Sequence, residues 1–207
     1  MIALREQYGL LRSFLGGEFR KILIRCLSGM LIAGAAGFAM GFFYPDIVEA
    51  TLEYFASIVE EAGIMNEDGS ISVFALLFNN WWAMLISAAY GFIPFIFLPM
   101  VSLISNGLIL GVFAAMYVSS GYGILAYIAG ILPHGIFELP ALVLSIACGV
   151  YLCLNMNRRI LGSDKKIPMV ELLSDLLRVL LLLVAPMVVA AAFIECYITP
   201  LLLGLFL

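Results

Sequence analysis

Residues 131–155 read ILPHGIFELPALVLSIACGVYLCLN, an apolar stretch with one histidine, one glutamate and no lysine or arginine. A helix needs about 20 apolar residues to cross a lipid bilayer, so this stretch is long enough. In lipid every backbone N–H and C=O must be paired within the protein, and only helices and closed barrels achieve this. Because the run is continuous rather than alternating with polar residues, it predicts a transmembrane helix rather than a barrel strand.

The rest of the chain has the same character. Hydrophobic residues make up 64% of the 207 residues and charged residues only 12%. Soluble proteins are typically about 25% charged. We therefore expect an all-α, polytopic transmembrane helical bundle in the lipid bilayer of the cell membrane, with no nucleic-acid partner. The four cysteines lie in or beside apolar runs and form no CxxC pair, which favours buried thiols over a disulfide framework.

Charged residues are segregated along the sequence, and this predicts the topology. Five of the ten basic residues precede the first apolar run and four more lie in 155–170, whereas 45–70 has seven acidic residues and no basic one. The positive-inside rule then places the N-terminus and loop 155–170 in the cytoplasm and the acidic loop 45–70 outside. Ahead of a single transmembrane domain, 26–207, we expect residues 1–25 to form an amphipathic cytoplasmic segment, or simply a charged lead-in.

The apolar runs divide into about five spans. A sixth span is the alternative if the last run is broken at Pro186. With five spans, the C-terminus is extracytoplasmic. The predicted spans are 26–44, 73–93, 99–118, a span within 123–155, and 176–207.

The fourth run is too long for a single straight span. Segment 123–155 would measure about 48 Å as one helix, against a hydrocarbon core of about 30 Å. Pro133, Gly135 and Pro140 lie in this segment, and proline and glycine favour an interruption. We therefore expect a broken or re-entrant helix near 123–135.

Two rows of small residues recur at four-residue spacing. Small side chains at this spacing allow helix backbones to approach closely in a membrane. The rows predict contacts between spans of one chain or, alternatively, the face of a homodimer. Their members are Gly29, Ala33, Gly37 and Gly41 in the first row, and Gly107, Gly111 and Ala115 in the second.

Ionisable residues within the apolar runs are costly in lipid and are candidates for a function. His134 and Glu138 are four residues apart and so share a helix face, and Glu195 lies in the last run. Counting the helical rise along each span puts these residues, together with Asn79 and Asn80, in the outer half of the bilayer. We expect them to form one polar cluster.

The cluster has two interpretations. His134, Glu138 and Glu195 can bind a divalent cation or relay protons. They can instead hydrogen-bond to one another and to backbone groups freed by the helix break, since unpaired polar groups are costly in lipid. A single histidine without an HExxH motif is a poor zinc site. We favour the structural interpretation and expect neither a cofactor nor a catalytic residue.

Four blocks of the sequence resemble the stage II sporulation protein M family and occur in the family's order. They are NN at 79–80, NGLILG at 106–111, LPHGIFELPA at 132–141 and AAFIECYITP at 191–200. The resemblance implies a multipass membrane protein that anchors and organises partners, which in spore-forming bacteria degrade peptidoglycan. No segment of this chain identifies such partners. The family's motif positions here are Asn106, Gly107, Gly111, His134, Gly135, Glu138, Pro140 and Glu195.

From the resemblance and the packing rows we expect a non-enzymatic membrane scaffold, homodimeric, that recruits membrane or cell-envelope proteins. The alternative is an ion- or proton-coupled transporter or channel that uses the His/Glu cluster, because transporters often build such sites on discontinuous helices. A membrane-embedded hydrolase using the same residues is a lower alternative.

Overall fold

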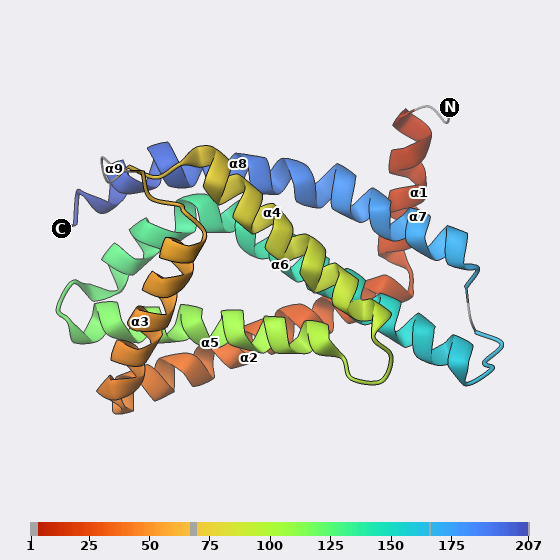
Figure 1. The fold of residues 1–207 in the computed structure, drawn as a ribbon, viewed down its shortest axis with the longest axis horizontal. Coiled ribbons are helices and arrows are strands. Elements are labelled where there is room, and N and C mark those ends of the chain that lie inside the picture. The colour runs from red at the N-terminus through yellow and green to blue at the C-terminus, as the bar shows by residue number, and fades with distance from the viewer. Residues whose placement is uncertain (1–3, 67–69, 166, 207) are drawn as a thin grey trace.

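The computed structural model describes residues 4–66, 70–165 and 167–206, and the helices account for most of them (Figure 1). Glu67, Asp68 and Lys166, which contribute to the predicted charge asymmetry, lie outside the described residues. The elements are α1 (Leu4–Gly16), α2 (Glu18–Phe43), α3 (Pro45–Glu61), α4 (Val73–Ala89), η1 (Tyr90–Phe92), α5 (Leu98–Ser119), α6 (Gly123–Ile160), α7 (Met169–Val179), η2 (Leu180–Val184), α8 (Ala185–Tyr197) and α9 (Thr199–Leu203).

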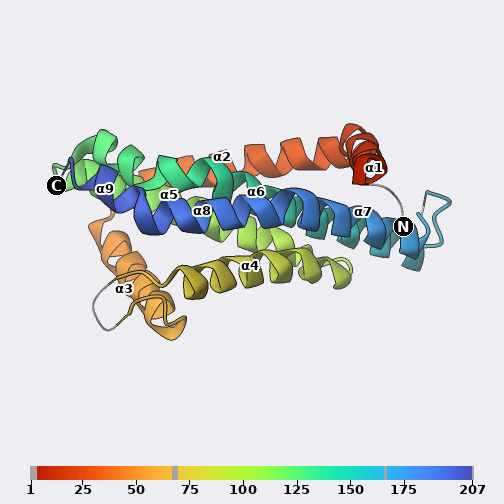
Figure 2. The same ribbon diagram turned by 90° about the horizontal axis from the view of Figure 1, so that it is seen from above.

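Five helical segments of the described chain are long and apolar enough to cross a membrane. This confirms the predicted all-α, five-span bundle. Helix α6 lies at its centre: 72% of its most apolar window is buried, against 22–33% for the other four segments. Figure 2 shows α2 on one side of the layer formed by α6 and α8, and α4 on the other.

The two ends of the bundle differ in charge. Helix α1 and the connection between α6 and α7 lie at one end, whereas α3 and α9 lie at the other (Figures 1 and 2). The basic segments are therefore separated from the acidic helix α3 along the length of the spans. Which end faces the cytoplasm stays a prediction.

The expected break near residues 123–135 is wrong, because the backbone is helical without interruption from Gly123 to Ile160. The ribbon of α6 instead changes direction in its N-terminal half (Figure 1). Pro133 and Pro140 lie inside the helix, and proline bends a helix because it lacks an N–H and its ring collides with the preceding turn. The surplus length of this segment is thus accommodated by a bend.

The last span is also continuous. Residues 169–197 form one rod of 29 residues, so the alternative with six spans does not hold. Pro186 lies in the first turn of α8, directly after the π-helical turn η2. In a π turn the hydrogen bonds run from i to i+5, and such a local adjustment lets a membrane helix accept a proline without breaking.

A short turn between η1 and α5 is tied to the end of α6. Phe95 and Phe97 have positive φ angles of 66° and 52°, which is unusual for bulky residues. The backbone N–H of Phe95 donates to Oδ1 of Asn157 at 2.8 Å. The side chain of Asn157 therefore compensates for the strained turn and fixes α4 and α5 against α6.

The two rows of small residues face each other across the contact between α2 and α5. A Cβ atom placed on Gly37 would lie 2.1 Å from the carbonyl oxygen of Leu108. One placed on Gly111 would lie 2.0 Å from the carbonyl oxygen of Gly34. Both distances are far below van der Waals contact, so only hydrogen fits at these positions and the two backbones touch directly.

A second glycine contact joins η1 and α4 to the centre of α6. A Cβ on Gly91 would lie 2.1 Å from the carbonyl oxygen of Gly149, and one on Gly149 would lie 2.4 Å from that of Ser87. Each glycine does lie four residues from other small residues, in the series Ala83, Ser87 and Gly91 and the series Ala141, Ser145 and Gly149. These series were not among the two rows predicted from the sequence.

Candidate functional site

Two helices bring the three intramembrane ionisable residues together. His134 and Glu138 lie on α6 and Glu195 lies on α8, which packs against α6. One ligand atom from each residue can be chosen so that all three lie within 4.8 Å of one another. Because α6 is helical through this region, His134 and Glu138 lie one turn apart on one face.

Both nitrogen atoms of His134 face polar groups. The side chain is buried, with 8% of the residue exposed. Its Nδ1 lies 3.1 Å from Oγ1 of Thr199, a hydrogen bond to the first residue of α9. Its Nε2 lies 3.8 Å from Oε2 of Glu138, which is too long for a hydrogen bond. Thr199 therefore holds the ring, and Nε2 faces the carboxylates.

Thr199 was not among the predicted site residues. It is buried, and it follows Glu195 by four residues, which is the spacing of neighbours on one helix face. That spacing is the sequence signal that could have identified it. Threonine is weak evidence by itself, however, because its hydroxyl usually finds a partner in its own helix.

The three asparagines predicted to be relevant behave differently. Asn106 donates from Nδ2 to the carbonyl oxygen of Ser102 at 2.8 Å, within its own helix. Asn79 and Asn80 lie on α4, which contacts α8. The amide nitrogen of Asn80 is buried without a hydrogen-bond partner among the described residues. That Asn79 and Asn80 belong to the cluster stays a prediction.

The residues assigned to the helix break shape α6 from within. Gly135 is buried, but a Cβ atom on it would meet only Ile131 and Leu139, at 3.3 Å and 3.6 Å, in the same helix. Gly135 is therefore not a close contact between helices. We attribute the bend to Pro133 and Pro140, because proline bends a helix. Pro133 directly precedes His134, and Pro140 follows Glu138 by two residues.

Among the described residues, no lysine or arginine forms an ion pair with the two carboxylates of the cluster. The other ion pairs between described residues join Arg158 to Glu18 and Arg178 to Asp175. Arg158 lies in the last turn of α6 and Glu18 in the first turn of α2, whereas Asp175 and Arg178 lie on α7, where Arg178 also donates to Gln7 of α1. Two carboxylates and an imidazole without a basic partner can share protons or bind a cation.

Comparison with known proteins gives two matches. A family model described as stage II sporulation protein M matches residues 29–200. An uncharacterized protein of Methanocaldococcus jannaschii is 32% identical over 126 residues, which cover 61% of this chain and 70% of that protein. No solved structure matches. The region matched by the family model contains His134, Glu138, Glu195 and Thr199.

Proposed function

This chain belongs to the stage II sporulation protein M family, and from that premise we propose that it is a non-enzymatic membrane organiser that recruits partner proteins. That family is not a known family of enzymes. The observation that carries the proposal is the acidic helix α3 at one end of the bundle (Figure 2). We infer that α3 faces the outside of the cell and docks a partner with a basic surface.

Helix α3 carries five exposed carboxylates. None of its residues is buried, and none of its carboxylates takes part in an ion pair between described residues. Complementary charge at an interface guides encounter and excludes wrong partners. The exposed acidic residues are Asp46, Glu49, Glu53, Glu60 and Glu61.

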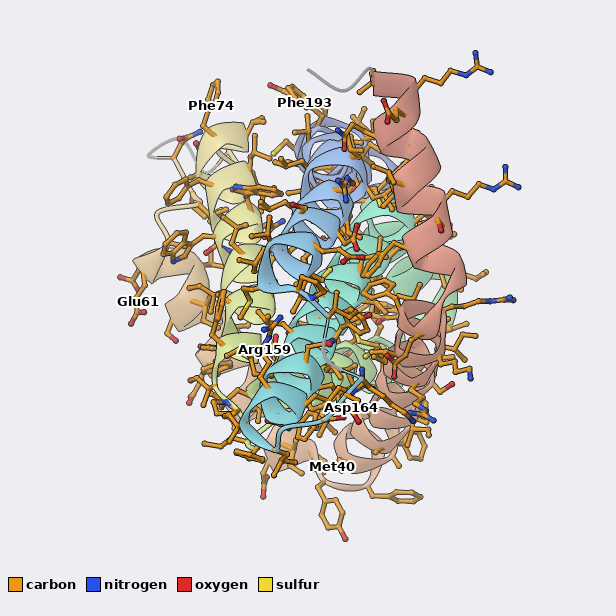
Figure 3. All side chains as sticks on the ribbon, turned by 90° about the vertical axis from the view of Figure 1, so that its right-hand side faces the viewer. Met40, Glu61, Phe74, Arg159, Asp164 and Phe193 are labelled. Carbon is orange, nitrogen blue, oxygen red and sulfur yellow. The ribbon has the colours of Figure 1, made fainter. Side chains whose placement is uncertain are left out.

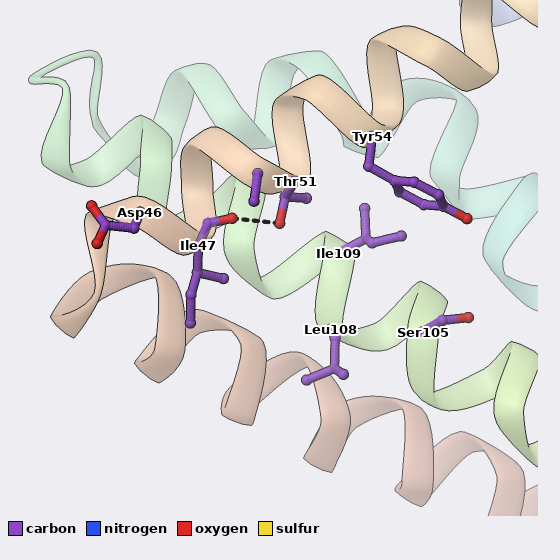
Figure 4. A pocket seen from close by; sticks show the side chains of 8 residues that line it. Asp46, Ile47, Thr51, Tyr54, Ser105, Leu108 and Ile109 are labelled. Atoms are coloured by element: carbon purple, nitrogen blue, oxygen red, sulfur yellow. Dashed lines mark hydrogen bonds between the residues drawn. The ribbon is translucent and has the colours of Figure 1, made fainter.

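The opposite side of α3 rests on the bundle. The rings of Phe55 and Phe113 meet edge to face, with their centroids 5.3 Å apart. Beside this contact, α3 and α5 line an open groove of about 520 Å³, whose wall includes Tyr54, Leu108 and Ile109 (Figure 4). Helix α3 is therefore anchored by apolar contacts, while its acidic side and part of the groove are free to meet a partner.

Site-specific photo-crosslinking in native membranes tests the proposal. A photo-reactive residue in place of Glu53 should give an adduct with a defined protein. The same residue in place of Phe74 should give none, because Phe74 projects from α4 and is 83% exposed on an apolar span (Figure 3). An adduct between two copies of this chain would show the predicted homodimer, which needs a face other than the two small-residue rows.

Charge dependence separates specific docking from chance contact. The triple variant Glu49→Gln, Glu60→Gln and Glu61→Gln should lower the yield of the Glu53 adduct several-fold, and added salt should do the same. Glu6→Gln, which removes an exposed carboxylate from α1, should leave the yield unchanged. Absence of any protein adduct, or a yield independent of the α3 charges, would overturn the organiser role.

An ion- or proton-coupled transporter is the second candidate function. The observation that favours it is the convergence of His134, Glu138 and Glu195 within 4.8 Å in the spans. Flux across the membrane of vesicles that contain the purified chain, abolished by Glu138→Gln, would support transport. Equal flux in both proteins would exclude a role for the cluster in transport.

A further inference from the structure

We propose that His134, Glu138 and Glu195 bind one divalent transition-metal ion, with Zn²⁺ as the representative ion. The site goes beyond the organiser role and does not depend on it. It differs from two expectations drawn from the sequence: that the three residues hydrogen-bond to one another, and that a single histidine makes a poor zinc site. The reasons lie in the spacing of the ligand atoms, the orientation of the histidine and the balance of charge.

The spacing suits a shared ion better than direct hydrogen bonds. Between described residues, no hydrogen bond joins any two of the three side chains, and Nε2 of His134 is 3.8 Å from Oε2 of Glu138. Two ligands that each lie about 2.1 Å from one metal ion are themselves about 3–4 Å apart. With all three ligand atoms within 4.8 Å of one another, a small inward shift of these side chains completes such a set.

The histidine is held as metal-binding histidines usually are. A ligating imidazole generally donates its second ring N–H to a neighbouring oxygen, which fixes the tautomer and the ring. Here Nδ1 of His134 faces Oγ1 of Thr199 at 3.1 Å. When that oxygen accepts the Nδ1 proton, Nε2 presents its lone pair to the space that it shares with Glu138 and Glu195.

Charge balance favours a doubly charged ion. Two ionised carboxylates in an apolar span are costly, and the described residues provide no lysine or arginine beside them. A divalent cation neutralises both carboxylates, so the complex with neutral imidazole carries no net charge. The ligand set also suggests the class of ion, because one imidazole and two carboxylates suit Zn²⁺, Mn²⁺ or Fe²⁺ rather than Mg²⁺. Three protein ligands leave a position for water.

Metal titration of the full-length chain tests the site. The protein is purified in detergent with a histidine-free tag, stripped with a chelator, loaded with Zn²⁺ and freed of excess metal. Mass spectrometry should then find about one zinc ion per chain, as expected of a single three-ligand site. Glu195→Gln should lose this ion, whereas Glu53→Gln, the same change on exposed α3, should keep it. Mg²⁺ in excess should not compete.

Thr199→Val provides a variant that keeps every ligand and both charges. It removes only the oxygen beside Nδ1, and losing such a partner weakens metal binding by about 10–100-fold. X-ray absorption of the zinc-loaded wild-type chain should show one nitrogen and two or more oxygen ligands at about 2.0–2.2 Å. Failure of the stripped wild-type chain to take up zinc would overturn the proposal. So would uptake that is equal in the wild type and Glu195→Gln.

Discussion

Helices α2 and α5 meet through glycine, whereas α6 meets α8 and α9 through a histidine, two glutamates and a threonine. Both contacts lie between spans, where lipid removes the usual hydrophobic driving force. At the first contact the backbones are so close that only a hydrogen atom separates Gly37 from the carbonyl oxygen of Leu108. At the second, polar atoms converge, and no lysine or arginine among residues 4–66, 70–165 and 167–206 forms an ion pair with the two carboxylates.

The two contacts differ in what they cost. Close packing of glycines places no ionisable side chain in the apolar span, and the van der Waals contacts between α2 and α5 stabilise the fold. The cluster of His134, Glu138 and Glu195 places ionisable groups in an apolar span at a cost in stability. Ionisable side chains that lower stability in this way are expected where they bind a ligand. Substitutions at the two contacts should therefore change stability in opposite directions.

The largest effect is expected at the glycine contact. In Gly111→Ala the new Cβ would lie 2.0 Å from the carbonyl oxygen of Gly34, so the backbones of α2 and α5 must move apart at this point. We expect unfolding in detergent to become easier by about 3 kcal/mol, the upper end for overpacked sites. The measurement is the free energy of unfolding by denaturant, followed by circular dichroism.

Gly130→Ala is the matched control for that substitution. Gly130 also lies in a span, on α6, but its nearest neighbour would be a Leu203 methyl group at 3.6 Å, an ordinary contact. Alanine is a better helix former than glycine by up to about 1 kcal/mol, so this variant should be unchanged or slightly more stable. Equal destabilisation of both variants would mean that the close approach of α2 and α5 is not what stabilises the bundle.

The opposite sign is expected at the cluster. In the metal-free protein, Glu195→Gln removes one of two carboxylates that lack a basic partner, so stability should rise by about 1–2 kcal/mol. The same unfolding measurement checks this in the presence of a chelator. Glu53→Gln on exposed α3 should stay within about 0.5 kcal/mol of the wild type. A clear loss of stability in Glu195→Gln would show that the cluster holds the helices together, as the structural interpretation proposes.

Much of the fold could be predicted because lipid leaves the backbone few choices. Apolar runs long enough to span had to become helices, which gave five spans and excluded strands. The four-residue rows at 29–41 and 107–115 marked surfaces of close approach, although they did not say which helix would face which. The spacing of His134 and Glu138 placed both side chains on one face of α6.

Other features were not accessible from residue types alone. The surplus length of 123–155 is compatible with either a break or a bend, and only the neighbouring helices decide between them. Gly91 and Gly149 each lie in a series of alanine, serine and glycine at four-residue spacing, but such a series does not say which helix it will face. The four-residue spacing places Thr199 on the same face as Glu195, but its contact with His134 depends on how α9 packs against α6, which is a tertiary feature.

Helix α6, which carries His134 and Glu138, is bent, and Pro140→Ala tests whether proline causes this bend. The substitution restores an N–H that can bond to the carbonyl oxygen of Ile136, so α6 should straighten. Spin labels at residues 124 and 160, in a chain whose native cysteines are replaced, should then move apart. The restored backbone hydrogen bond stabilises the variant, whereas straightening α6 removes contacts with the neighbouring helices. The two effects offset each other, so the free energy of unfolding should change by no more than about 1 kcal/mol. Pro45→Ala, at the start of α3, should leave the label distance unchanged; a bend that persists in Pro140→Ala would be imposed by packing.

The smallest effect is expected where the chain leaves the apolar spans. Arg158 donates two hydrogen bonds to Glu18, at 2.8 Å and 2.5 Å, but the glutamate side chain is 45% exposed. Exposed ion pairs contribute about 0–1 kcal/mol and are screened by salt, so Glu18→Gln should cost no more than about 0.5 kcal/mol. This small loss should vanish in about 1 M salt, where the Debye length is about 3 Å. A salt-independent loss of stability in Glu18→Gln as large as that in Gly111→Ala would contradict this comparison. An exposed ion pair would then stabilise the bundle as much as the direct backbone packing of α2 and α5.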